Sequence, residues 1–247
     1  MSPAIKSNFA ARIDDAQERQ PKRVVFPTHA QNPLLVNGAD SSNPALVEAF
    51  KSLRTQVLKP HLSSDVRSFV VTSAAQADGK TITTFNLACS FAKLEDISIL
   101  LVDADLRTQG LSKLVGNVPD TGLQDFLTGT AECDEIVSKS NLGDLWIVGA
   151  GTSSSVSPAE LFSSGRWLQF VLWARKHFKI VLLDSPPNNA VADFELISSA
   201  CDGIVLVVRA LKTPREALEE SLRQINARKL VGVVWNGSPK TRNYRYR

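Results

Sequence analysis

The sequence is poor in several residue types, and each shortage excludes a class of protein. It has three cysteines in 247 residues, an odd number without a C-x-x-C pair, which fits a reducing cytoplasm and not a disulfide-bonded secreted domain. No segment approaches the roughly 20 apolar residues that span a bilayer, and the N-terminus lacks the apolar core of a signal peptide. We therefore expect a cytoplasmic protein that contacts a membrane only through a partner.

The sequence also has a small net charge and no repeated segments. The formal charge of +3 is small and evenly spread, so nucleic acid is not an expected partner. The chain has no internal repeat and no low-complexity tract. Its length suits a single α/β domain with tails.

Composition divides the chain into three parts. Residues 1–43 are polar and rich in Asn, Gln, Ser and Asp, so we expect a largely flexible arm whose short VVF run is able to pair as an edge strand. Asn43 and Pro44 form a good helix start, because Asn caps free N–H groups and proline has the first-turn φ. We place the folded domain at residues 44–237 and a basic tail at residues 238–247. The apolar face of the first helix is expected to consist of Leu46, Phe50, Leu53 and Val57.

Apolar runs alternate with amphipathic segments from Val66 onward, a pattern typical of parallel strands joined by crossover helices. Runs this uniformly apolar are expected to be covered on both faces. The sequence therefore predicts an α/β fold of three layers, a mostly parallel central sheet flanked by helices on both faces. The expected strands are SFVVTS, ISILLVD, LWIVGAG, KIVLLD, GIVLVVR and LVGVVWN, with helices from about Lys80, Pro158 and Pro214.

The segment from Ala74 to Thr81 reads A-x-x-x-x-G-K-T between a strand-like run and a helix, the context of a phosphate-binding P-loop. Backbone N–H groups of the turn and the helix N-terminus would point at phosphate oxygens. Gly79 lets the backbone come close, Lys80 brings positive charge to the β- and γ-phosphates, and Thr81 offers a hydroxyl to magnesium. Ala74 replaces the usual first glycine, and a strand-to-helix turn without a ligand is the alternative. The predicted nucleotide-binding residues here are Ala75, Gln76, Ala77, Asp78, Gly79, Lys80, Thr81 and Ile82.

Carboxylates follow two of the apolar runs. In ILLVDADLR the apolar run ends with Asp103 and Asp105, and in IVLLDSPP the apolar run ends with Asp184. Open α/β sheets bind ligands at these carboxyl ends of strands, and a carboxylate after a buried run is costly unless solvent, a cation or donors satisfy it. A magnesium nucleotide meets that demand, whereas for each segment alone a loop-capping aspartate is the other interpretation. Arg209 and Asn236 end two further runs and are candidates to line the nucleotide site or to cap loops.

Together these motifs resemble those of the bacterial tyrosine kinases of capsule and exopolysaccharide systems, a branch of the P-loop ATPases. The resemblance also includes EAFKSLRT, GLQDFLTG, VSPAELFSS and DGIVLVVRALKT, and it spans roughly residues 44–237. It implies ATP and Mg²⁺ as cofactors. It implies that Asp103 is the general base for the tyrosine hydroxyl, that Asp105 and Asp184 hold magnesium with Thr81, and that Lys80 stabilises the transferring phosphoryl group.

The supply of tyrosine is the second informative feature. The chain has two tyrosines, Tyr244 and Tyr246, both within its last four residues. This resembles a shortened form of the family's C-terminal tyrosine cluster and implies autophosphorylation, in which the tail of one subunit enters a neighbour's site. The neighbouring arginines would steer the tail toward bound phosphates. An ordinary basic tail, or a membrane-surface or nucleic-acid contact, is the alternative for the tail alone.

Two positions depart from the family pattern. Ala77 stands where the family commonly has a glycine of the loop. Glu48, Lys51 and Arg54 give E-x-x-K-x-x-R, whereas the family's ring-forming pattern has arginine in the middle. Lysine cannot reproduce a bidentate guanidinium contact, and these charges can equally form a solvated helix face.

The resemblance also implies partners. These are a transmembrane activator of the polysaccharide chain-length type, further copies of the chain in an oligomer such as a ring, and a cognate tyrosine phosphatase. The protein would then lie at the inner face of the plasma membrane.

The sequence is also compatible with two other functions. One is an ATPase switch of the MinD and ParA type, although Ala75 occupies the place of those proteins' additional loop lysine. The other is a catalytically weak nucleotide-binding regulator of a polysaccharide assembly complex.

Overall fold

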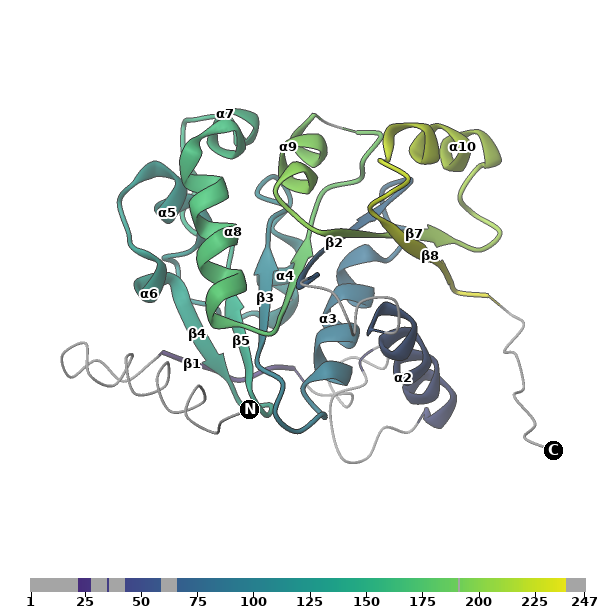
Figure 1. The fold of residues 1–247 in the computed structure, drawn as a ribbon, viewed down its shortest axis with the longest axis horizontal. Helices are drawn as coiled ribbons and strands as arrows, with labels where there is room; N and C mark the ends of the chain where they lie inside the picture. Colours follow the sequence, from purple (N-terminus) through teal and green to yellow (C-terminus); the bar gives the residue numbers. More distant parts are fainter. Residues whose placement is uncertain (1–21, 28–34, 36–42, 59–65, 191, 239–247) are drawn as a thin grey trace.

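The computed structural model describes residues 22–27, 35, 43–58, 66–190 and 192–238, which form one twisted sheet with helices on both faces (Figure 1). The strands lie in the order β1-β4-β5-β3-β6-β2-β7-β8, and all neighbours pair parallel except β4 and β5. The strands are β1 (Arg23–Val24), β2 (Ser68–Ser73), β3 (Ile99–Asp103), β4 (Val137–Ser140), β5 (Leu145–Val148), β6 (Ile180–Asp184), β7 (Gly203–Arg209) and β8 (Leu230–Asn236). The helices are α2 (Pro44–Leu58), α3 (Lys80–Phe91), α4 (Gly110–Val115), α5 (Leu123–Thr128), α6 (Cys133–Ile136), α7 (Pro158–Ser163), α8 (Gly165–His177), α9 (Asp193–Ser199) and α10 (Arg215–Gln224).

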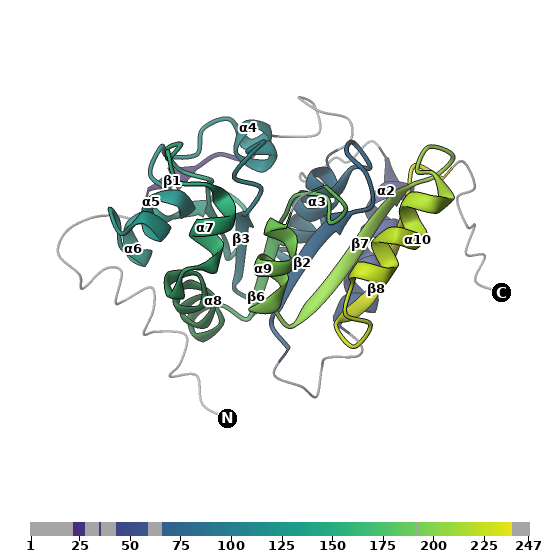
Figure 2. The same cartoon turned by 90° about the horizontal axis from the view of Figure 1, so that it is seen from above.

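The sheet separates two hydrophobic cores, as the predicted three-layer fold requires. Helices α2, α3 and α4 cover one face, and α7 to α10 cover the other (Figure 2). The side chains of β2 alternate between these layers, with Phe69 and Val71 in the core under α3 and Val70 in the opposite core. The predicted α/β architecture with a mostly parallel sheet is therefore confirmed. Among the described residues, no helix is long and apolar enough to cross a membrane.

Helix α2 begins as the sequence predicts. The Asn43 side chain accepts the backbone N–H of Leu46 at 3.0 Å, which caps the first turn. Its predicted apolar face packs on the core that contains α3. The residues of this face are Leu46, Phe50, Leu53 and Val57.

The charged face of α2 is engaged within the chain. Lys51 pairs with Glu48 at 2.6 Å, and Arg54 donates to the carbonyl oxygen of Ser90 near the end of α3. A cation at this place satisfies a free carbonyl group at the C-terminus of a helix. Arg54 thus ties α2 to α3, whereas the Lys51–Glu48 pair lies within α2, and the predicted ring of subunits stays a prediction.

The described part of the N-terminal arm packs on the domain. Strand β1 pairs parallel with β4, which bears out the expected edge pairing for Val24. Val24, Phe26 and Leu35 are buried, and the rings of Phe26 and Phe85 lie 5.1 Å apart. The flexible character of the arm stays a prediction, because most of residues 1–43 lies outside the described part of the chain.

Two features of the sheet differ from the sequence prediction. The polar strand β4 runs antiparallel to β5, and its sequence VSKS carries no apolar run. At the other edge, β8 is not covered on both faces as predicted, since Val233 is 45% and Trp235 is 56% exposed. Among the described residues, strand β8 has a sheet neighbour on one side only and forms the edge of the sheet (Figure 2).

Candidate active site

The P-loop connects β2 to α3, and its own side chains and those of two distant strands hold it in place. The Asp78 carboxylate accepts the N–H of Ala75 at 2.9 Å and the hydroxyl of Thr213, after β7, at 2.8 Å. The Asn236 side-chain amide, at the end of β8, donates to the Asp78 carbonyl at 2.8 Å. Asp78 and Asn236, both predicted to contact nucleotide, therefore also fix the shape of the loop.

Backbone conformation explains the residues at the turn. Gly79 has φ 95°, and a Cβ at this position would overlap the Asn236 side chain, so the close approach requires glycine. Ala77 adopts φ 65°, a left-handed conformation that costs an L-residue roughly 1–2 kcal/mol. Gln109 and Leu211, in the loops after β3 and β7, share this conformation with φ 51° and 61°. Three of the four described non-glycine residues with positive φ thus lie in loops at the carboxyl end of the sheet, as is common at functional sites, and the fourth, Asp96, precedes β3.

Replacing Ala77 by glycine is expected to raise the free energy of unfolding by about 1 kcal/mol, because glycine adopts a positive φ without a Cβ clash. Ala75, in the same loop, is not among the residues with positive φ. Its replacement by glycine is therefore expected to lower the free energy of unfolding by about 0.5–1 kcal/mol. Urea unfolding followed by tryptophan fluorescence measures both changes, and equal effects at the two positions would contradict the strain argument.

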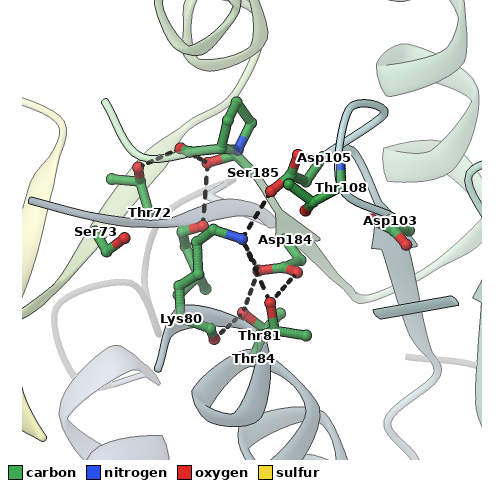
Figure 3. Close-up of polar contacts among 12 residues, drawn as sticks. Thr72, Ser73, Lys80, Thr81, Thr84, Asp103, Asp105, Thr108, Asp184 and Ser185 are labelled. Atoms are coloured by element: carbon green, nitrogen blue, oxygen red, sulfur yellow. Dashed lines mark hydrogen bonds and ion pairs between the residues drawn. The ribbon is translucent and has the colours of Figure 1, made fainter. Parts of the chain in front are cut away.

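Lys80 lies between two buried carboxylates (Figure 3). Its ammonium is 2.8 Å from Asp105 Oδ2 and 3.9 Å from Asp184 Oδ1. The Thr81 hydroxyl donates to Asp184 Oδ2 at 2.7 Å, and the Thr84 hydroxyl lies 3.4 Å from Asp184 Oδ1. The structure thus brings together four residues that were predicted from three separate segments: Lys80, Thr81, Asp105 and Asp184.

Asp103 lies beside this group but is held differently. It pairs in register with Asp184 on the neighbouring strand. Its Oδ2 accepts both the N–H and the hydroxyl of Ser112 in α4, each at 2.7 Å, and its Oδ1 is buried without a hydrogen-bond partner among the described residues. The predicted base is therefore adjacent to the magnesium candidates but bonded to α4, not to Lys80.

Burial and mutual repulsion set the protonation of these groups. Burial raises the pKa of Asp184 to about 7 and that of Asp103 to about 6, against the lowering effect of Lys80 and of Ser112, respectively. Burial would also raise the pKa of Asp105, but the Lys80 ammonium outweighs it and holds that pKa below the ordinary value. Burial would lower the pKa of Lys80, yet Asp184 and Asp105 keep it above its usual value.

The residues fit a magnesium nucleotide. Within the part of the chain that the structure describes, no group of three or more His, Cys, Asp and Glu side chains is arranged to hold a metal ion alone. Magnesium in nucleotide sites, however, takes one or two carboxylates together with phosphate oxygens and waters. Gly79, the N-cap residue of α3, has no side chain to cap the helix, so the first N–H groups of α3 are available to phosphate as far as the described residues show. The orphaned Asp103 Oδ1, and the excess of buried carboxylates over the Lys80 ammonium, both favour a bound cation.

The other predicted nucleotide contacts lie in or beside the loop. The Arg209 guanidinium lies near Gly79 and packs against Gly237. Gln76 is exposed in the loop, whereas the Ile82 side chain packs on the core with α3, so its backbone N–H is what remains for phosphate. Their contacts with a nucleotide stay predictions.

Several residues of the site were not predicted from the sequence. Asn189 donates to the carbonyl oxygens of Ala74 at 3.2 Å and of Ala217 at 2.8 Å, which connects the P-loop to α10. Thr84 was detectable, because it follows Lys80 by one helical turn. Thr213 and Asn189 carry no local signal of their place in the site, since their P-loop partners, Asp78 and Ala74, lie more than 100 residues away.

Comparison with known proteins places this site in a family. The chain is 30% identical over 203 residues to the tyrosine-protein kinase YwqD of Bacillus subtilis, covering 81% of this chain and 84% of that protein. It is 31% identical over 195 residues to the tyrosine-protein kinase CpsD of Streptococcus pneumoniae serotype 4, covering 76% and 83%. No protein-family model matches the chain.

Solved structures agree with these relatives. The kinase domain of the Escherichia coli tyrosine kinase ETK superposes with a TM-score of 0.76 at 26% identity, over 100% of this chain and 90% of that domain. The septum site-determining protein MinD of Pyrococcus horikoshii, complexed with Mg-ADP, gives a TM-score of 0.54 at 18% identity, which shows a shared fold alone. The identity to tyrosine kinases over most of both chains is the decisive result, and it shows that this chain belongs to the bacterial tyrosine-protein kinases built on the P-loop ATPase fold.

Proposed function

We propose that this kinase uses ATP and magnesium to phosphorylate tyrosines of its own C-terminal tail, with one copy acting on another, and so regulates the synthesis and export of a capsular or extracellular polysaccharide. One observation carries the proposal. At the N-terminus of α3, Lys80 and Thr81 contact Asp105 and Asp184. The same chain has two tyrosines, and both lie within its last four residues.

Each residue has a role that its environment supports. Lys80 leaves Asp105 to bind the β- and γ-phosphates, where the free N–H groups of α3 also bind. Thr81, Asp105 and Asp184 would hold magnesium, which supplies positive charge to the transferring phosphoryl group. Asp103 receives the tyrosine proton, and its raised pKa of about 6 makes it a stronger base than an ordinary aspartate.

The length of the tail alone does not select the acceptor site. Three strand spacings separate β6 from β8 in the sheet, which is about 14 Å. Nine residues follow Ser238, and an extended chain of that length reaches about 30 Å. A tail is therefore long enough for its own site or a neighbour's, and transfer between copies needs a direct test.

A mixing experiment separates these routes. Lys80→Met protein supplies an intact tail without catalysis, and a chain truncated after Ser238 supplies the site without tyrosines. With labelled ATP and magnesium, the mixture is expected to label the Lys80→Met protein. If the mixture stays unlabelled while a separate sample of wild type is labelled, the transfer takes place within one copy.

The tyrosines are tested by substitution. The variant Tyr244→Phe/Tyr246→Phe is expected to lose all label while its affinity for ATP stays within about twofold, because the substitution lies outside the P-loop. Tyr244→Phe and Tyr246→Phe alone show which hydroxyl is used. Normal ATP hydrolysis without tyrosine label, even with an activator, would instead support a switch of the MinD and ParA type.

The proposed setting also includes partners. A relative from Klebsiella pneumoniae, 29% identical over 98% of this chain, is named a putative tyrosine-protein kinase in the cps region, and this chain spans 32% of that relative. We propose a transmembrane chain-length regulator as activator at the inner face of the plasma membrane, an oligomer of this chain, and a phosphatase that reverses the modification. Addition of the regulator's cytoplasmic segment is expected to increase tail labelling.

A further inference from the structure

A bidentate ion pair joins the two loops that carry the acidic residues of the site. Arg107, in the loop after β3, donates from Nε to Asp193 Oδ2 at 2.7 Å and from Nη2 to Asp193 Oδ1 at 3.1 Å. Asp193 begins α9, which follows the loop after β6, and it is 2% exposed, whereas 45% of the Arg107 side chain is exposed. Parallel contacts of this kind fix the orientation of both groups.

The position of this pair relates it to the reaction. Arg107 is two residues from Asp105, and Asp193 is nine residues from Asp184. The loop after β3 is also fixed by a hydrogen bond of its own, in which the N–H of Thr108 donates to Asp105 Oδ1 at 3.1 Å. The pair therefore spans the two strands that supply the predicted magnesium ligands.

The need for such a pair follows from the role proposed for Lys80. Lys80 holds Asp105 directly in the structure. When Lys80 binds phosphate, Asp105 loses this partner, and its loop is then held against the neighbouring loop by Arg107 and Asp193. A displacement of about 1 Å in a catalytic group can reduce the rate about 100-fold.

We infer that Arg107 and Asp193 are positioning residues, which lock the loops after β3 and β6 together so that Asp105 stays in place during phosphoryl transfer. This inference rests on the proposed kinase function of the site. A purely structural role is the competing explanation, because a buried aspartate that loses its cation destabilises any fold.

The test uses Arg107→Lys, which keeps the charge and loses the planar fork. Steady-state labelling of the tail is measured at several ATP concentrations. We expect kcat to fall about 10- to 100-fold while the KM for ATP changes less than about threefold. Asp193→Asn is expected to give a similar loss, and the double variant no more than either single one, since both remove the same interaction.

Arg175→Lys is the matched control. Arg175 forms a partly buried ion pair with Asp202, at 3.2 Å, and Asp202 accepts the N–H of Ser68 at the opposite end of β2 from the P-loop. This variant is expected to change the melting temperature about as much as Arg107→Lys and to leave kcat within about twofold. A kcat loss of the same size in both variants, or an unchanged kcat in Arg107→Lys, would overturn the inference.

A second measurement keeps the inference separate from the proposed function. Affinity for a fluorescent ADP is measured with and without Mg²⁺. Arg107→Lys is expected to reduce the gain in affinity that Mg²⁺ gives by about two- to threefold and to leave the magnesium-free affinity unchanged, whereas Arg175→Lys changes neither. If the wild type transfers no phosphate, the proposed function is wrong. The effect of Mg²⁺ on ADP affinity then tests by itself whether Arg107 and Asp193 position Asp105.

Discussion

Lys80→Met is expected to reduce phosphotransfer by at least about 1,000-fold and to weaken ATP binding, because it removes the cation that contacts Asp105 and Asp184 and that we propose to bind the phosphates. Isothermal titration with MgATP and tail labelling measure the two effects. Lys176→Met, on the exposed side of α8, is the control for loss of a lysine and is expected to change neither.

The same variant has an unusual effect on the ligand-free protein. Without the Lys80 ammonium, Asp105 and Asp184 keep their full burial and lose their only ion-pair partner among the described residues. The pKa of each carboxyl then rises, and at pH 8 each group must either keep an unpaired buried charge or take up a proton, both of which lower the stability of the fold. We expect Lys80→Met to melt at a lower temperature than wild type at pH 8 and to regain much of the difference at pH 5. A pH-independent difference would mean that these carboxylates find other partners.

Much of the fold was predictable because its signals are local. The apolar runs of β2, β3, β6 and β7 are buried as their composition indicates. The motif around Lys80 lies between a strand and a helix, and parallel strands bring Asp105 and Asp184 to the same edge as this loop. Strand β4 was missed because VSKS has neither an apolar run nor alternation that marks it against the neighbouring turns.

The contacts that shape the site were not predictable, because sequence spacing carries no information about them. Thr213 and Asp78 are 135 residues apart, and Arg107 and Asp193 are 86 residues apart. The left-handed conformation of Ala77 is a similar case, since alanine usually avoids it and only the distant contacts of the loop impose it. The sequence therefore predicted the candidate ligands of phosphate and magnesium, whereas the structure was needed to identify the contacts that hold these residues in place.

Asp184→Asn is expected to make the ligand-free protein more stable at pH 8 and to abolish phosphotransfer. Asp184 is fully buried, and its pKa is raised from 3.8 to about 7 by burial, against the lowering effect of Lys80. The folded state therefore binds more protons than the unfolded state between about pH 4 and pH 7. The free energy of unfolding of the wild type then falls as pH rises through this window and is constant above it. Asparagine keeps the shape without the charge, so the variant should gain about 1–3 kcal/mol over wild type at pH 8 and little at pH 5.

Thermal unfolding without nucleotide, from pH 5 to pH 8, measures this difference, and replacement of the exposed Asp134 of α6 by Asn is the control for the loss of a surface carboxylate. Magnesium nucleotide should reverse the order of stability, because the wild type gains binding energy from a carboxylate that the variant lacks. A variant that is less stable than wild type at pH 8 would show that the Asp184 charge is already compensated by Lys80 and Thr81. The excess of negative charge would then no longer argue for a cation. A more stable, inactive variant would instead mean that the fold keeps a destabilising charge at this strand end because phosphoryl transfer requires it.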